Sequence, residues 1–318
     1  MVSINNAASW VTLQDIQSAN TRLSGVAVRT PLVPLKLPGA SGEVFIKNEG
    51  LQRTGSFKLR GAYNKIAQLP TEERGRGVIT YSSGNHAQGV AYAARALGVK
   101  SVIVMPRNAS EFKQRATAEL GAEIVLVGPA SAERKQKAEE LAAQFGYAIV
   151  PPYDDAAIIA GQGTCGLEIV EELPDIELVL APVSGGGLLS GVAVAVKSLK
   201  PEARVVGVEP ELAADAQESF RSGSLVIWPA EKTTRTACDG LRTQSLGELN
   251  FLHIRRFVDN ILTVSEDEVR EAMRVLASAG ITAEPSGAVT AAAILFHAME
   301  LPASRKAVAV MSGGNYLP

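Results

Sequence analysis

A lysine stands in the first turn of a predicted helix, within the segment Thr-Gly-Ser-Phe-Lys-Leu-Arg-Gly at residues 54–61. Thr54 or Ser56 is the expected N-cap, since a hydroxyl at that position accepts a backbone N–H. The positive end of the helix dipole disfavours a protonated amine in the first turn. Lys58 is therefore a candidate nucleophile, because a neutral amine attacks a carbonyl and holds it as an imine. The alternative is an ordinary surface lysine.

Three segments rich in glycine and polar side chains each follow a predicted strand: residues 82–89, 184–191 and 312–315. Backbone N–H groups at loops and helix starts bind anions, so the first segment suits a carboxylate and glycines 185–187 suit a phosphate. Ser190 stands where a dinucleotide fingerprint needs its third glycine, and no Gly-Lys-Ser or Gly-Lys-Thr ends the segment. We interpret His86 as a structural or substrate-orienting group. Ordinary capped turns are the alternative for all three segments.

Two acidic residues flank Ala213 shortly after another predicted strand. Glu209 and Asp215 could bind a hard cation such as Mg²⁺ or Ca²⁺ together with a backbone carbonyl, because these cations prefer oxygen ligands. Solvated carboxylates at the end of a strand are the simpler interpretation of the spacing alone.

The elements that must position these residues alternate between strand and helix. Short apolar runs at residues 78–81, 102–105, 124–127 and 148–150 alternate with helical patterns, and Gly98, Gly121 and Gly146 follow the helices as C-caps. Further strands are expected at residues 44–47, 178–183, 205–209, 261–264 and 307–311. The pattern predicts an α/β protein with two open, mostly parallel twisted sheets and flanking helices. The smaller lobe, residues 77–150, is inserted into a large domain made of residues 1–76 and 151–318.

Composition excludes several classes of function. The 318 residues carry a formal net charge of −2 without a block of like charge, so we expect no nucleic-acid partner. The uncharged stretch at residues 178–196 has Gly185, Gly186 and Gly187 in its middle and is predicted to be a strand, a turn and a helix, so we expect no membrane partner. Two cysteines, Cys165 and Cys238, are too few for a disulfide framework. With no secretory signal pattern, a cytoplasmic location is expected.

The motifs together resemble those of the fold-type II pyridoxal-phosphate enzymes, and more narrowly of the serine/threonine dehydratase and serine racemase family. The resemblance runs from about residue 16 to residue 315 and is carried by four motifs in the same order: Ser56-Phe57-Lys58-Leu59-Arg60-Gly61, Ser82-Ser83-Gly84-Asn85-His86, Ser184-Gly185-Gly186-Gly187-Leu188 and Ser312-Gly313-Gly314-Asn315. It implies a fold like that of the tryptophan synthase β-subunit.

The resemblance implies pyridoxal 5'-phosphate as cofactor and gives each motif a role. Lys58 is expected to bind the cofactor covalently and to remove the Cα proton. The residues implied to contact the cofactor are Phe57, Lys58, Asn85, Ser184, Gly185, Gly186, Gly187, Leu188, Glu284 and Ser312. Asn85 is expected at the phenolic oxygen of the ring and Ser312 at the pyridine nitrogen. The substrate carboxylate is expected to lie against Ser82, Ser83, Asn85 and His86.

The implied chemistry is β-elimination. Many pyridoxal enzymes place a charged residue at the pyridine nitrogen. Ser312 leaves the ring largely neutral, and a neutral ring is a weaker electron sink that favours prompt loss of a β-leaving group. We expect L-serine or L-threonine to be converted to a keto acid and ammonia. Ser83 could return a proton on the face opposite Lys58, so racemase activity is also expected as possible.

Other activities stay open at the level of sequence. They are a serine or aspartate racemase, a threo-3-hydroxyaspartate dehydratase, a cysteine-synthase-like enzyme and a non-catalytic amino-acid sensor. The resemblance also favours a divalent-metal site at Glu209, Ala213 and Asp215, for Mg²⁺, Ca²⁺ or Mn²⁺, and a homodimer. The sequence does not set the preferred substrate, the ratio of elimination to racemisation, the metal or the response to nucleotides.

Overall fold

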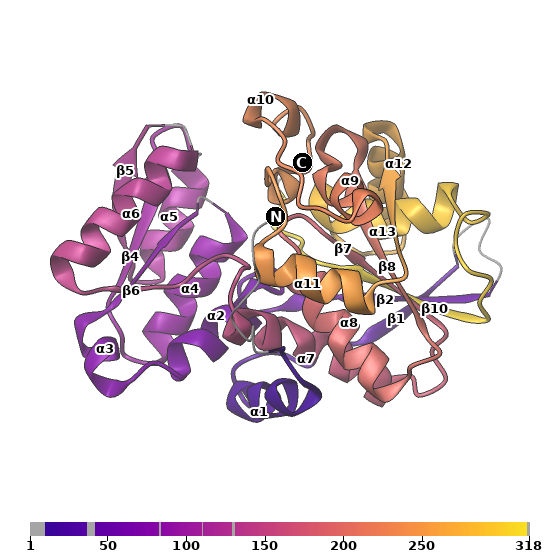
Figure 1. Cartoon of the computed structure of the whole chain (residues 1–318), viewed down its shortest axis with the longest axis horizontal. Coiled ribbons are helices and arrows are strands. Elements are labelled where there is room, and N and C mark those ends of the chain that lie inside the picture. The colour runs from indigo at the N-terminus through magenta and orange to yellow at the C-terminus, as the bar shows by residue number, and fades with distance from the viewer. Residues whose placement is uncertain (1–9, 37–41, 83, 110, 129–130, 317–318) are drawn as a thin grey trace.

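The chain folds into two lobes, each built on its own sheet (Figure 1). The computed structural model describes residues 10–36, 42–82, 84–109, 111–128 and 131–316. Ser83 therefore lies outside the described residues.

The larger lobe contains a six-stranded sheet in the order β1-β2-β10-β7-β8-β9. All neighbouring strands are parallel except β1, which pairs antiparallel with β2. The strands are β1 (Leu32–Leu35), β2 (Glu43–Asn48), β7 (Leu178–Pro182), β8 (Arg204–Pro210), β9 (Asn260–Val264) and β10 (Lys306–Met311). The sequence pattern predicted five of these strands and missed β1, whose residues are only partly buried.

Helices cover both faces of this sheet, because successive side chains of a strand point to opposite sides. Leu178 and Leu180 of β7 pack against α12 (Glu266–Ser278) and α13 (Pro285–Phe296). Val179 and Ala181 pack on the other side against α7 (Ala156–Glu172), α8 (Gly187–Leu199), α9 (Asp215–Ser222) and α11 (Glu248–Phe257). The near-continuous apolar runs in the sequence reflect this double burial.

The smaller lobe contains a four-stranded parallel sheet in the order β5-β4-β3-β6. Its strands are β3 (Val78–Tyr81), β4 (Ser101–Pro106), β5 (Glu123–Val127) and β6 (Ala148–Ile149), and its helices are α4 (Asn85–Ala96), α5 (Glu111–Glu119) and α6 (Ser131–Phe145). The short helix α3 (Thr71–Arg76) precedes β3 and contacts β6. Gly98, Gly121 and Gly146 have φ angles of 66°, 89° and 71°, as predicted for residues that end a helix in the left-handed region. The α/β prediction with two mostly parallel sheets is confirmed.

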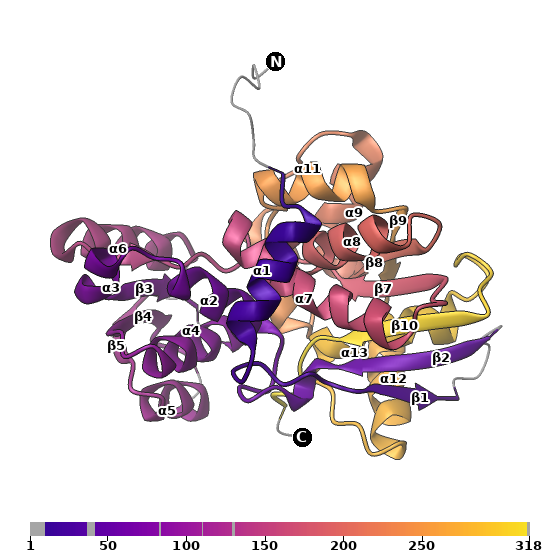
Figure 2. The same ribbon diagram turned by 90° about the horizontal axis from the view of Figure 1, so that it is seen from below.

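Two helices lie at the junction of the lobes. α2 (Lys58–Ala67) contacts α4 of the smaller lobe and α7 of the larger lobe, and α1 (Leu13–Leu23) lies against α2 and α7 (Figure 2). We propose the division into residues 77–150 and residues 1–76 plus 151–318, with α2 as the element that both lobes share.

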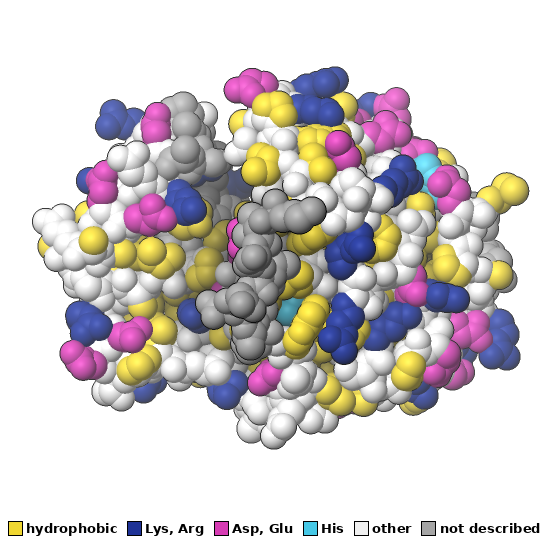
Figure 3. Space-filling model, in the orientation of Figure 1, with side chains coloured by type: hydrophobic (Ala, Val, Ile, Leu, Met, Phe, Trp, Pro, Cys, Tyr) yellow, Lys and Arg dark blue, Asp and Glu magenta, His cyan; other side chains and the backbone are white. Residues whose placement is uncertain are grey.

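The shorter elements are η1 (Glu49–Leu51), η2 (Glu211–Ala213), α10 (Ala230–Thr233) and η3 (Asp239–Leu241). Within the described ranges, no helix combines the length and apolar character that crossing a membrane requires. Acidic and basic side chains are interspersed over the face shown in Figure 3, as the small net charge predicts.

Candidate active site

Lys58 is the first residue of α2, and the segment before it pairs with the end of β10. Ser56 forms an antiparallel bridge with Gly313, and the Phe57 N–H donates to the Ser312 carbonyl at 3.1 Å. The prediction that Thr54 or Ser56 caps the helix was wrong, because Phe57 occupies the N-cap position and makes no side-chain cap hydrogen bond. Because Ser56 and Phe57 pair with the end of β10, Lys58 follows directly after the residue that is hydrogen-bonded to the Ser312 carbonyl.

The Lys58 amine is largely withdrawn from solvent. Its Nζ donates to the Pro152 carbonyl at 2.8 Å and lies 5.1 Å from the centroid of the Phe57 ring. Burial lowers the pKa of Lys58 to about 8, and the nearby Glu284 carboxylate partly opposes this shift. A far larger fraction of the amine is neutral near physiological pH than in an ordinary lysine.

A buried set of charges anchors α2 to the larger lobe. The Arg60 guanidinium donates to both carboxylate oxygens of Glu49 at 2.7 and 2.8 Å and of Glu168 at 2.7 and 2.8 Å. It also donates to the Thr164 hydroxyl at 3.0 Å, and Lys47 donates to Glu168 at 2.7 Å. Two cations and two anions balance, so every charge has a partner and the start of α2 has one defined position.

Asn85 begins α4 in the smaller lobe and contacts two residues of the larger lobe. Its Nδ2 donates to Glu284 Oε1 at 2.7 Å, and its Oδ1 accepts from Asn315 Nδ2 at 2.7 Å. The substrate-loop motif after β3 and the last motif after β10 therefore meet, as expected from their positions at the ends of strands.

His86 is buried next to Asn85 and is neutral. Its Nε2 lies 3.0 Å from the Val150 carbonyl, which can only accept, so the proton is on Nε2. Burial lowers the pKa of His86 to about 3, and the positive charge of Lys58 adds to this shift. A neutral histidine hydrogen-bonded to the backbone is compatible with the structural or substrate-orienting role predicted from the sequence.

The glycine loop after β7 is built for close approach of a ligand to the backbone. Ser184 has a φ of 55° and Gly186 a φ of 94°, and Gly186 caps α8 without any side-chain hydrogen bond. A Cβ at Gly185 would lie 2.4 Å from the Tyr153 ring, so only glycine fits. Uncapped N–H groups at the start of a 13-residue helix fit the phosphate of the expected cofactor. Ser184 holds the loop through a 3.1 Å contact with the Thr243 hydroxyl.

Ser312 and Glu284 form the opposite side of this region. Ser312 is buried, and its hydroxyl donates to the Ser286 carbonyl at 3.5 Å. Burial raises the pKa of Glu284 to about 7, with a further contribution from the Asp239 carboxylate and an opposing one from the Asn85 hydrogen bond. A neutral hydroxyl at residue 312 fits a pyridine nitrogen that stays unprotonated.

Glu209, near the end of β8, and Asp215, the first residue of α9, form a separate buried pair. One oxygen of each carboxylate, Oε2 and Oδ2, is buried without a hydrogen-bond partner among the residues that the structure describes, and the buried Ala213 lies close by in the chain. Burial and the neighbouring Asp215 charge raise the pKa of Glu209 well above its ordinary value, and burial raises that of Asp215 to about 7. Unpartnered carboxylate oxygens of this kind fit a hard cation. Within the described residues, no cluster of three or more His, Cys, Asp or Glu side chains has metal-binding geometry.

Residues 150–155, which lead from β6 into α7, contribute to the site without having been predicted from the sequence. Pro152 supplies the carbonyl that accepts from Lys58, and the Tyr153 ring packs on Gly185. Asp154 accepts from the N–H groups of Glu248 and Leu249 at the start of α11. The position of this segment at the C-terminal end of a parallel strand is the signal that could have identified it.

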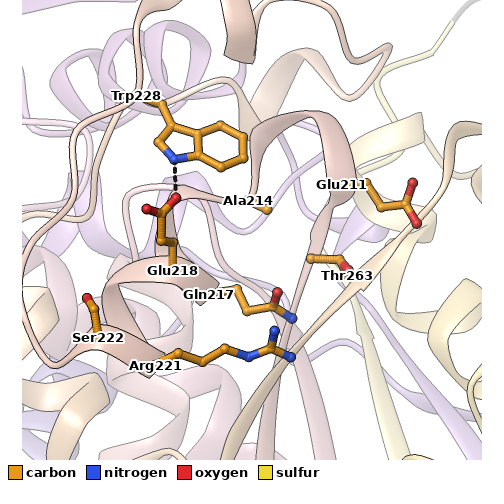
Figure 4. Close-up of a pocket in the computed structure, with 8 residues that line it drawn as sticks. All are labelled: Glu211, Ala214, Gln217, Glu218, Arg221, Ser222, Trp228 and Thr263. Carbon is orange, nitrogen blue, oxygen red and sulfur yellow. Dashed lines mark hydrogen bonds between the residues drawn. The ribbon is translucent and has the colours of Figure 1, made fainter.

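A pocket of about 610 Å³ lies on the outer surface beside α9, away from Lys58. It is lined by Glu211, Ala214, Gln217, Glu218, Arg221, Ser222, Trp228 and Thr263, and the Trp228 indole donates to Glu218 at 2.7 Å (Figure 4). Its lining contains none of the residues selected from the sequence.

Comparison with known proteins agrees with this geometry. A family model described as pyridoxal-phosphate dependent enzyme matches residues 23–313. The chain is 44% identical over 310 residues to the L-threonine ammonia-lyase of Thermotoga maritima, covering 96% of this chain and 76% of that protein. It is 41% identical over 307 residues to the L-threo-3-hydroxyaspartate ammonia-lyase of Saccharomyces cerevisiae, covering 96% and 93%. The crystal structure of serine racemase from Dictyostelium discoideum matches with a TM-score of 0.90 and 36% identity, covering 97% and 99%.

Proposed function

Since this chain belongs to the pyridoxal-phosphate-dependent family of threonine dehydratases and serine racemases and is an ammonia-lyase, we propose that its substrates are L-threonine and L-serine. The substrate would lose its Cα proton and its β-hydroxyl as water, and the product would hydrolyse to a keto acid and ammonia. Pyridoxal phosphate, when bound, supplies the electron sink for the negative charge that develops at Cα.

The position of Lys58 carries this proposal. Its amine has a pKa of about 8, donates to Pro152, and lies next to the segment that contacts the glycine loop. In our proposal Lys58 Nζ would hold the cofactor and, when it is free as an amine, would accept the Cα proton, which then leaves with the β-hydroxyl as water. Phe57 packs beside this amine and keeps water from it.

The remaining motif residues have proposed binding roles. The N–H groups of residues 184–188 bind the cofactor phosphate, and Glu284 contacts the ring from the side of Asn85. Asn85 donates to the phenolic oxygen, and Ser312 faces the pyridine nitrogen without protonating it. The substrate carboxylate is bound by Ser82, Ser83, Asn85 and His86.

A second candidate function, amino-acid racemisation, is favoured by Ser83. A hydroxyl there could protonate Cα on the face opposite Lys58. The 36% identity to a solved serine racemase supports this candidate, and the yeast relative supports L-threo-3-hydroxyaspartate as a further substrate.

We also propose a divalent cation, Mg²⁺, Ca²⁺ or Mn²⁺, at Glu209, Asp215 and the Ala213 carbonyl. The unpartnered buried carboxylate oxygens support this site. A homodimer and a cytoplasmic location complete the proposal.

Chiral chromatography tests the activity. Purified protein with pyridoxal phosphate and Mg²⁺ is supplied separately with L-serine, L-threonine and L-threo-3-hydroxyaspartate, and keto acid and inverted amino acid are measured together. Keto acid in excess supports the dehydratase and ranks its substrates, whereas mostly D-amino acid favours the racemase. If none of the three amino acids gives keto acid or inverted amino acid, the proposal is overturned.

A further inference from the structure

We infer that Asn315 and Glu284 fix the orientation of the Asn85 side-chain amide, so that Asn85 presents an N–H group to the bound cofactor. This inference rests on the proposed function, in which Asn85 contacts the phenolic oxygen of pyridoxal phosphate. It assigns positioning roles to two side chains that lie on either side of Asn85, in the larger lobe.

The orientation of both amides follows from one backbone carbonyl. Asn315 faces the Thr54 carbonyl oxygen at 2.8 Å, and because that oxygen only accepts, the facing atom of Asn315 must be Nδ2. The same nitrogen lies 2.7 Å from the Asn85 side chain, whose facing atom must then be the acceptor Oδ1. The opposite atom of the Asn85 amide is therefore Nδ2, which donates to Glu284 Oε1 at 2.7 Å.

We call the hydrogen-bonded series formed by the Thr54 carbonyl, Asn315, Asn85 and Glu284 the relay. The amide hydrogens of its two asparagines account for every contact in it. Asn315 Nδ2 has two hydrogens, and Thr54 and Asn85 accept one each. Asn85 Nδ2 also has two hydrogens, and its bond to Glu284 leaves the second for a ligand. The opposite amide orientation would present Oδ1, which cannot donate and would repel an ionised phenolic oxygen.

The backbone around the relay is shaped to hold Asn315. Gly55 has a φ of 69°, and a Cβ there would lie 2.0 Å from Asn315 Oδ1. A Cβ at Gly313 would lie 2.3 Å from Glu284 Oε1 and 3.2 Å from Asn85 Nδ2. Two glycines therefore give the side chains of the relay the space in which they meet.

The absorption spectrum of the bound cofactor tests the inference. An N–H donated to the phenolic oxygen favours its ionised form, which absorbs at longer wavelength than the un-ionised form. In Asn315→Asp, the carboxylate cannot donate, so Asn85 loses the contact that fixes its orientation. We expect the ratio of long-wavelength to short-wavelength absorption to fall about fivefold, the effect of one hydrogen bond. The dissociation constant of the cofactor, from the same titration, should rise by a similar factor.

Thr54→Val is the matched control. It keeps the backbone carbonyl that anchors the relay and removes only a buried hydroxyl that has no partner among the described residues. The spectrum of this variant should equal that of the wild type. An unchanged ratio in Asn315→Asp, or an equal change in Thr54→Val, would overturn the inference.

A double-mutant comparison separates positioning from a general structural effect. In an Asn85→Ala background, Asn315→Asp should change the ratio no further, because its effect acts through the Asn85 amide. A further fall of the same size in that background would contradict the relay. Asn315→Ala replaces Asn315→Asp if the buried carboxylate prevents folding. A wild-type protein that binds no cofactor would instead refute the proposed function.

Discussion

The pH dependence of covalent capture at Lys58 follows from the burial of its amine. Burial lowers the pKa of Lys58 from 10.5 to about 8. At pH 7, roughly one amine in ten is then neutral, against roughly one in three thousand at the ordinary pKa. Because only the neutral amine attacks an aldehyde, Lys58 should react with the aldehyde of the cofactor several hundredfold faster at pH 7 than a lysine with the ordinary pKa of 10.5. The rate should rise with pH, reach half its maximum near pH 8, and then level off.

A single substitution tests the cause of this shift. The Glu284 carboxylate stabilises the Lys58 ammonium and so raises its pKa. Glu284 itself has a pKa of about 7, so it is mostly ionised in the range where Lys58 loses its proton. Glu284→Gln removes the negative charge, the ammonium becomes less stable, and the pKa of Lys58 should fall. The midpoint of the rate profile should therefore move below that of the wild type.

The assay uses protein freed of cofactor and mixed rapidly with pyridoxal phosphate at pH 6 to pH 10, followed by absorbance. The same reaction with Nα-acetyl-lysine amide corrects for ionisation of the cofactor itself. Lys58→Ala measures capture by other lysines and should remove the fast reaction. A midpoint near that of the model amine, or an upward shift in Glu284→Gln, would refute the reasoning.

Three further substitutions test the anchor, the cation site and the second proton donor. Glu168→Leu leaves Arg60 and Lys47 buried without their shared acceptor and should lower the free energy of unfolding in urea by about 3–5 kcal/mol; a loss below about 1 kcal/mol would contradict the role of the network. Mg²⁺ at one hundred times its dissociation constant should stabilise the wild type by about 2.7 kcal/mol, and Asp215→Asn should abolish this gain; an equal gain in both proteins places the cation elsewhere. Ser83→Ala should retain more elimination than racemisation when both products are counted, and equal loss of both would exclude a second-face role for Ser83.

Much of the fold could be predicted because it depends on local pattern. Strands buried on both faces appear as short apolar runs, and glycines 98, 121 and 146 end helices where a side chain would be strained. The ends of parallel strands identified the loops around Ser82, Ser184 and Ser312. The exception is β1, an edge strand with little burial and therefore a weak pattern.

The candidate site was less predictable where it depends on contacts between distant segments. The N-cap expectation for Thr54 and Ser56 was wrong because Ser56 pairs with Gly313 and Phe57 takes the N-cap position. The bond from Lys58 to the Pro152 carbonyl joins residues 94 positions apart. Backbone carbonyls carry no sequence signature, so no pattern of residue types could have selected Pro152.

The placement of α2 explains how one site can be assembled from two lobes. Arg60 fixes α2 to Glu49 and Glu168 of the larger lobe, while Leu59, Ala62 and Ile66 pack in the core of the smaller lobe. Because α2 is fixed to both lobes, Lys58 at the start of this helix has a defined position relative to each lobe. Asn85 begins α4, which packs on α2, and among the described residues its side chain forms hydrogen bonds with Glu284 and Asn315 of the larger lobe. In our proposal the reactive amine is thus held by buried charges and packed side chains, and Asn85, which we place at the cofactor ring, is held by the packing of α4 on α2 and by two side chains of the larger lobe.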